Sequence, residues 1–189
     1  MATLTDHTIA ILATEGVERV ELEEPRKALQ EAGATVELVG LSTDAFRTFD
    51  HLDASGREET PDVAVADADA AKYDGLLLPG GVANPDQLRG DEAAVAFAKA
   101  FFQAGKPVAA ICHGPWLLVE ADVVKGRKVT SFPTLQTDLR NAGATWVDEE
   151  VVVDQGLVTS RNPDDIPAFN AKAIEEFAEG RHKGQTRSA

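Results

Sequence analysis

The chain has 189 residues, 43% of them hydrophobic and 26% charged, which is enough for one globular domain with a sizeable core. Its net charge of −14 disfavours binding to nucleic acid or to anionic lipid, so we expect neither as a partner. It contains no apolar run of about 18 residues that would predict a transmembrane helix. The N-terminus lacks the positive charge of a secretory signal, and the single cysteine excludes an internal disulfide. Both features favour a cytoplasmic location.

Short apolar runs alternate with amphipathic stretches along the chain. The apolar runs predict strands at 8–14, 35–41, 75–81, 106–112 and 127–132, the third of them ending in a glycine-rich turn. The amphipathic stretches predict helices at 17–33, 91–105, 114–124, 135–143 and 162–180. Residues 43–72 are polar and mixed, and they favour a hairpin around "ASGR" (54–57). Residues 145–161 predict two short strands around "DQG" (154–156).

Apolar strands that alternate with helices predict an α/β fold. We expect a three-layer sandwich, with a mostly parallel sheet covered by helices on both faces. Residues 1–180 then form a single domain, and the polar, basic segment 181–189 is expected to be a flexible tail. In such sheets, functional sites gather at the carboxyl ends of the strands, where "PGG" (79–81) and "CHGP" (112–115) are expected to lie.

The stretch "AAICHGPW" (109–116) holds the single cysteine and has the pattern of a nucleophile elbow. Such a turn needs small residues two positions before and after the nucleophile, and these are Ala110 and Gly114. The start of the following helix favours an anion, which would lower the pKa of Cys112. The N–H groups of His113 and Gly81 are candidates for an oxyanion hole. The alternative is a buried, inert cysteine that packs as a small hydrophobic residue.

These residues resemble the ThiJ/PfpI superfamily, which includes the intracellular protease I family, bacterial general stress proteins and the Parkinsonism-associated deglycase. The resemblance is carried by "AICHGPWLL", "YDGLLLPGGVANPDQLR" and "DLRNAGATWVDEEVVVD", and it extends over nearly the whole chain. It implies a flavodoxin-like, class I glutamine amidotransferase-like fold. It also implies a homo-oligomer, at least a dimer.

The resemblance implies roles for individual residues. Cys112 would be the reactive residue and His113 its acid/base partner, assisted by an acidic residue from the neighbouring subunit, for which the "PGGVANPD" loop offers Asp86. The archaeal protease form has a Glu at this place and a shorter loop, so Asp86 as a turn residue is the alternative. A glutamate of the first helix would contact the sulfur. Glu21 is the first choice and Glu18 would line the same pocket, unless both are solvated helix-face residues.

A carboxyl beside a thiolate is favourable only when it is protonated, so we expect a raised pKa for Glu21 and a depressed one for Cys112. The spacing of His7, His51 and His182 does not suit a metal site, His51 is expected at the surface, and no cofactor is expected.

Three functions are compatible with these residues. The first is a cysteine-dependent, hydrolase-type stress enzyme whose thiolate attacks a peptide, a small aldehyde or a glycated group. The second is a redox sensor that uses oxidation of Cys112, and the third is a binding module with an inactive site.

Overall fold

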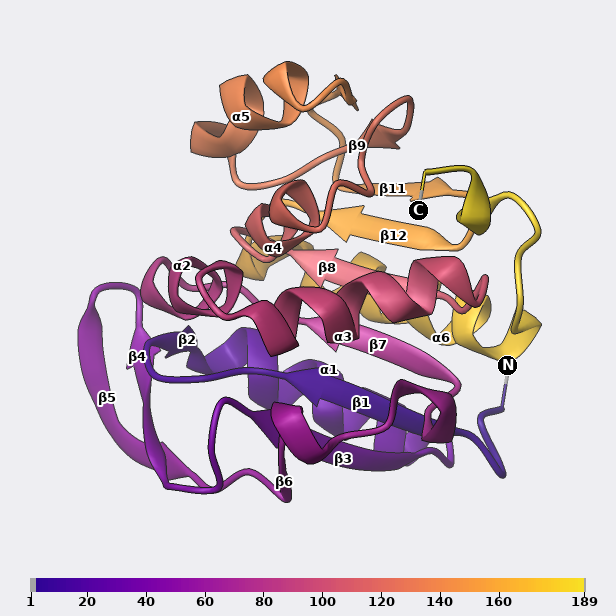
Figure 1. The fold of residues 1–189 in the computed structure, drawn as a ribbon. Helices are drawn as coiled ribbons and strands as arrows, with labels where there is room; N and C mark the ends of the chain where they lie inside the picture. Colours follow the sequence, from indigo (N-terminus) through magenta and orange to yellow (C-terminus); the bar gives the residue numbers. More distant parts are fainter. Residues whose placement is uncertain (1–2, 189) are drawn as a thin grey trace.

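A computed structural model describes residues 3–188 and contains a central seven-stranded sheet (Figure 1). The strand order is β11-β12-β8-β7-β1-β3-β6, and every neighbouring pair is parallel except β11 with β12. The strands are β1 (Thr8–Leu12), β3 (Thr35–Gly40), β6 (Val63–Ala64), β7 (Gly75–Leu78), β8 (Val108–Ile111), β11 (Val151–Asp154) and β12 (Leu157–Ser160). The expected mostly parallel sheet is confirmed.

Helices cover both faces of this sheet, as expected for a three-layer sandwich (Figure 1). One face carries α1 (Arg19–Glu31) and α6 (Ile166–Glu179). The other carries α2 (Ala83–Arg89), α3 (Glu92–Gln103) and α4 (Pro115–Glu120). A smaller helix, α5 (Gln136–Asn141), lies beyond the edge of the sheet. Short 3-10 turns occur at Val65–Asp67, Ala70–Lys72, Pro133–Leu135, Pro163–Asp165 and Gln185–Ser188.

The alternation of side chains along the central strands explains why the core has two halves. In β1, Ile9 and Ile11 face the layer of α1 and α6, whereas Ala10 and Leu12 face the layer of α3. All four are fully buried, and burying a large aliphatic side chain contributes about 1.5–3 kcal/mol. Apolar residues on both faces of a strand are the pattern from which a covered parallel sheet was expected.

The hairpin in residues 43–72 exists, but its turn lies elsewhere than expected. β4 (Phe46–Asp50) pairs antiparallel with β5 (Asp53–Glu59), so the chain reverses at His51–Leu52, and β2 (Val17–Glu18) completes a three-stranded sheet. The "ASGR" segment lies inside β5 at a register shift. Gly56 adopts φ +77° there, so the glycine forms a bulge rather than the turn.

The predicted strand at 127–132 does not join the central sheet. Only β9 (Lys128–Val129) is regular, and it pairs with β10 (Thr145–Trp146) in a separate two-stranded sheet. Phe132 then donates its N–H to the carbonyl of Cys112 at 2.8 Å, which brings the following residues to the elbow. Helix α2 was not predicted, because its residues follow the "PGG" turn without a clear helical period.

Of the segment 181–189 that is expected to be a flexible tail, Ala189 lies outside the described residues, and the described part contacts the rest of the chain. His182 donates its N–H to the carbonyl of Gly105 at 2.8 Å. Gln185 is buried, its side-chain amide donates to the carbonyl of Lys106, and its own carbonyl accepts from Arg127. A polar segment can be held by buried hydrogen bonds as well as by apolar residues.

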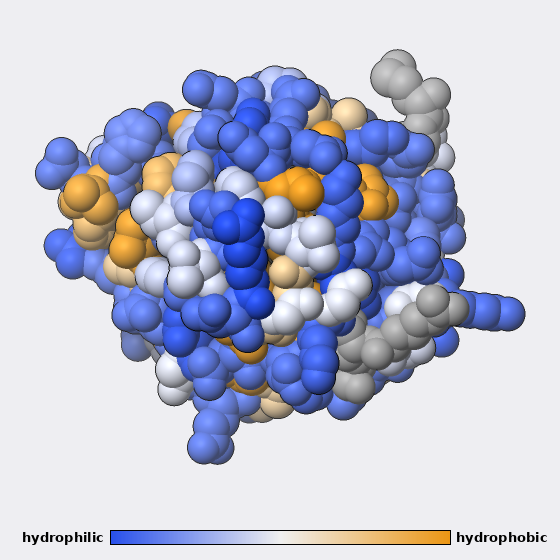
Figure 2. Space-filling view, turned by 90° about the horizontal axis from the view of Figure 1, so that it is seen from above, coloured by the Kyte–Doolittle hydropathy of each residue, from blue (hydrophilic) through white to orange (hydrophobic). Residues whose placement is uncertain are grey.

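Seen from above, on the side where α5 lies in Figure 1, the surface is mainly hydrophilic and its hydrophobic residues form small separate patches (Figure 2). This distribution agrees with the net charge of −14. Within residues 3–188, every helix is too short or too polar to cross a membrane.

Candidate active site

Cys112 lies on the turn between β8 and α4, in the strained backbone conformation of a nucleophile elbow. Its φ is +61°, which costs a non-glycine residue on the order of 1 kcal/mol or more. Its N–H donates to the carbonyl of Ser160 at 3.1 Å, and its carbonyl accepts from Phe132. A Cβ at Gly114 would lie 2.5 Å from the carbonyl oxygen of Leu78, so only glycine fits two residues after the cysteine.

The thiol of Cys112 is buried among hydrogen-bond donors. The N–H groups of Gly81 and His113 both point at the sulfur. These are the two groups expected to form an oxyanion hole, and in this structure they contact the sulfur itself. Gly81 reaches this position because its φ of +82° turns the "PGG" segment against Gly16 and Glu18, where a Cβ would collide with backbone atoms.

Glu21 is the helix-one glutamate that contacts Cys112. It is completely buried, and one of its carboxyl oxygens accepts from the N–H of Gly80 at 2.8 Å. Its other oxygen is buried and has no hydrogen-bond partner among the described residues. Burial raises the pKa of Glu21 to about 8, partly offset by the hydrogen bonds from Gly80 and Cys112. The carboxyl is therefore protonated near neutral pH, as the contact with a thiolate requires.

The prediction of a depressed pKa for Cys112 is wrong for this structure. Burial raises the pKa of the thiol well above its ordinary value, and a charged Glu21 raises it further. The N–H groups of Gly81 and His113 oppose this shift. Whether Glu21 raises or lowers the pKa of Cys112 depends on its own protonation state. A protonated carboxyl donates a hydrogen bond to the thiolate, whereas a charged carboxylate repels it. The two groups therefore titrate as a coupled pair.

His113 faces the nucleophile although it is the next residue along the chain. Its Nδ1 lies 3.2 Å from Sγ of Cys112, and its Nε2 lies 3.3 Å from the hydroxyl of Thr134. Phe132 stacks on the ring with centroids 4.7 Å apart. Burial lowers the pKa of His113, so its imidazole is neutral near pH 7 and has one nitrogen free to accept a proton.

The other two predicted acidic residues lie farther from the sulfur. Glu18 is buried at the start of α1, accepts the N–H of His51 at 2.8 Å, and lines the same cavity as Cys112. Asp86 is exposed on α2 and lines a neighbouring cavity. Within residues 3–188 no hydrogen bond joins Asp86 to His113, whose outer nitrogen is next to Thr134 instead. One chain alone therefore does not assemble the Cys–His–Asp set.

Cys112 lines a cavity of about 560 Å³. Sequence reasoning missed much of its wall. The additional lining residues are His51, Leu52, Val82, Trp116, Phe132, Thr134 and Pro163. His51 and Leu52 were missed because the hairpin turn was expected at "ASGR". Thr134 was missed because a strand was expected at 127–132. In the structure the strand ends at Val129, and the residues after it approach the elbow.

An α/β sandwich with a buried cysteine on a strand-to-helix elbow, beside a histidine and a protonated glutamate, is the arrangement that the resemblance to the ThiJ/PfpI superfamily predicts. The chain belongs to the DJ-1/PfpI family, which it matches over residues 7–176. The expected family is thereby confirmed.

Two bacterial relatives and one solved structure illustrate the similarity. The chain is 46% identical to general stress protein 18 of Bacillus subtilis and 44% identical to protein/nucleic acid deglycase 2 of Escherichia coli. Each match covers 88% of this chain and 95% of the relative. It superposes on DJ-1beta of Drosophila melanogaster with a TM-score of 0.83 and 27% identity, covering 94% of this chain and 91% of the other.

Proposed function

We propose that this protein is a cysteine-dependent stress enzyme whose Cys112 thiolate attacks the carbonyl of a small aldehyde or of a glycated group. The observation that carries the proposal is that Cys112 and His113 line a cavity of about 560 Å³ with a mostly apolar wall. A cavity of this size suits a small molecule. An extended peptide would need a groove, so peptide hydrolysis is the less favoured activity.

The neighbouring groups supply the proton transfers. Nδ1 of neutral His113 accepts the thiol proton, and the sulfur adds to the aldehyde carbon to form a hemithioacetal. With methylglyoxal, a proton then moves from that carbon to the adjacent carbonyl carbon through an enediol, which leaves a lactoyl thioester. Water hydrolyses the thioester, releases lactate and restores the thiol. The net reaction adds one water to methylglyoxal and needs no oxidant or cofactor.

The names of the relatives agree with this chemistry, since one is a general stress protein and another a protein/nucleic acid deglycase. For this chain we expect small carbonyl groups to enter the cavity. The net charge of −14 still disfavours stable binding to nucleic acid. The single cysteine suits a reducing cytoplasm.

Conversion of methylglyoxal to lactate by the purified protein tests the proposal. We expect turnover by the natural chain and background rates for Cys112→Ser, which replaces the sulfur by a weaker nucleophile of similar size. Equal rates for the two proteins would contradict the proposal. The same pair assayed on an unstructured peptide separates aldehyde chemistry from proteolysis.

A second candidate is redox sensing through Cys112. The N–H groups of Gly81 and His113 and the protonated Glu21 are donors that would also hold the oxygens of a sulfinate. Mass spectrometry after mild peroxide treatment tests it. Oxidation of Met1 or the tryptophans before Cys112 gains oxygen would contradict the sensor.

A further inference from the structure

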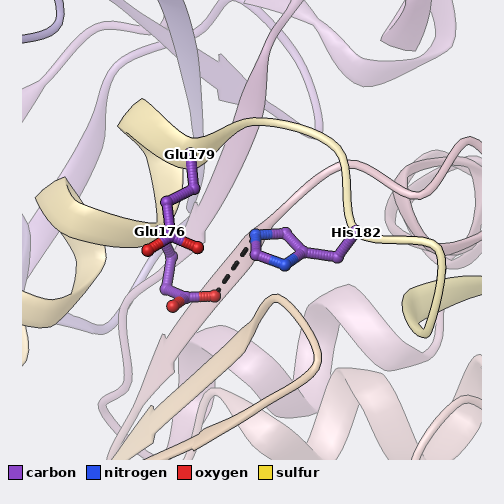
Figure 3. Close-up of side chains that lie close together, drawn as sticks. All are labelled: Glu176, Glu179 and His182. Atoms are coloured by element: carbon purple, nitrogen blue, oxygen red, sulfur yellow. Dashed lines mark ion pairs between the residues drawn. The ribbon is translucent and has the colours of Figure 1, made fainter.

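A second group of reactive side chains lies at the C-terminal end of α6, outside the Cys112 cavity. Glu176 and Glu179 project from successive turns of the helix, and the imidazole of His182 faces Glu176 (Figure 3). One ligand atom from each of the three residues lies within 4.8 Å of the other two. Gly180 makes this possible, because its φ of +78° ends the helix and turns the chain back over it.

The backbone on either side of His182 is fixed. Its N–H donates to the carbonyl of Gly105 at 2.8 Å, and its own carbonyl accepts from Gln185 at 3.0 Å. The ring lies against Gly156 in the turn between β11 and β12, where a Cβ would be 2.8 Å from Cδ2 of the imidazole. The imidazole is therefore held in place before any ligand arrives, which lowers the entropy cost of binding.

One polar atom of this cluster, Nε2 of His182, is buried without a hydrogen bond among the described residues. It lies 3.3 Å from a carboxyl oxygen of Glu176, but not in acceptable hydrogen-bond geometry. The Glu176 side chain is only 10% exposed, so its carboxyl is largely removed from water. A cation between the two residues would give both atoms a partner.

We propose that Glu176, Glu179 and His182 bind one divalent metal ion of the zinc type. One imidazole nitrogen and two carboxylate oxygens are a donor set that Zn²⁺ accepts, with water in the remaining position. Ligand bonds of about 2.0–2.2 Å at tetrahedral angles separate donors by about 3.4 Å. The Glu176–His182 pair already has a separation of 3.3 Å, and the exposed Glu179 completes the set by a side-chain rotation. The two carboxylates balance the charge of the ion.

This site is structural and separate from the thiol. Gly105 and Gly156 precede β8 and β12, so the cluster lies at the amino ends of the parallel strands, whereas Cys112 follows the carboxyl end of β8. A bound ion would tie the segment after α6 to that helix. Sequence spacing predicted no metal site here, because the reversal at Gly180 cannot be seen in the histidine positions.

Calorimetric titration of the full chain with Zn²⁺ tests the proposal. The titration is made on Cys112→Ser protein so that the thiolate cannot act as a ligand. We expect one ion per chain and a rise in Tm on binding. Adding His182→Ala or Glu179→Gln should weaken binding at least tenfold and abolish the rise in Tm.

Glu175→Gln is the matched control, because it removes the same charge from the same helix at a residue that pairs with Lys172 outside the cluster. It should bind Zn²⁺ like the parent. Glu179 is exposed, so its variant tests the site even if His182→Ala fails to fold. Absence of zinc binding by the parent, or equal affinity in the Glu179→Gln and Glu175→Gln proteins, would overturn the proposal.

Discussion

At the scale of single residues, the protonation state of Glu21 and that of Cys112 depend on each other. Two buried acidic groups in contact cannot both ionise without a large cost, so the first proton lost determines the state of the pair. Burial raises the pKa of Glu21 to about 8, and burial also raises that of Cys112. A thiolate near neutral pH therefore requires that Glu21 keep its proton and donate a hydrogen bond to the sulfur.

This proton makes the stability of the fold depend on pH. Glu21 holds its proton up to about pH 8 in the folded chain, whereas the unfolded carboxyl releases it near 4.5. Its stabilising contribution is thus complete below pH 4.5 and is lost as the pH rises to about 8. The slope is about 1.4 kcal/mol per pH unit. Urea unfolding of the natural chain and Glu21→Gln between pH 5 and 8 measures this. The amide does not titrate, so the difference between the two proteins should fall with pH, and a constant difference would contradict the assignment.

At the scale of elements, the strands and helices of the sandwich could be predicted because their apolar patterns are local. The elbow could be predicted as well, since it needs small residues at fixed positions around Cys112. The wall of the Cys112 cavity could not be predicted from the sequence. Its hairpin turn lies at His51–Leu52, where the sequence lacks a glycine, whereas Gly56 forms a bulge that resembles a turn signal. Contacts such as Thr134 with His113 depend on the path of the chain between β9 and α5, which no local pattern encodes.

The "PGG" turn is the element that holds the site together, and Gly80 is its tightest point. A Cβ there would lie 2.6 Å from the carboxyl of Glu21, 2.7 Å from Cβ of Cys112 and 2.9 Å from the nitrogen of His113. Gly80→Ala should therefore lower the free energy of unfolding by about 2–3 kcal/mol, as other overpacked cores do. It should also slow iodoacetamide labelling of Cys112.

Gly90→Ala is the matched control for that variant. Gly90 ends α2 with φ −82°, and a Cβ there would come no closer than 3.4 Å to another atom, the carbonyl oxygen of Gln87. Its free energy of unfolding should stay within about 0.5 kcal/mol of the natural value. Urea denaturation compares the two variants. Equal stabilities would show that the turn has room for a side chain and that the site is looser than these distances imply.

At the scale of the whole molecule, the question is how Asp86 could reach a histidine. Within one chain it lines a cavity next to that of Cys112, and the two cavities share His51, Leu52, Val82 and Trp116. Leu52 is 76% exposed and Val82 is 42% exposed, the two most exposed large hydrophobic residues among those described. Apolar side chains at the mouth of an active site are favourable when a second subunit covers them. We therefore expect that this chain forms a homo-oligomer and that the contact covers Leu52 and Val82, with Asp86 directed at the partner's cavity.

Leu52→Asp tests this arrangement because it places a charge in the expected contact. Sedimentation at micromolar concentration should show at least a dimer for the natural chain and a monomer for the variant. Turnover should fall with dissociation if Asp86 assists the histidine of a second chain. Val153→Asp makes the same change at a 40% exposed position on β11, so it should leave both mass and turnover unchanged. A monomeric natural chain, or an oligomer unaffected by Leu52→Asp, would contradict both the expected contact at this surface and the role of Asp86. His113 would then depend only on groups of its own chain.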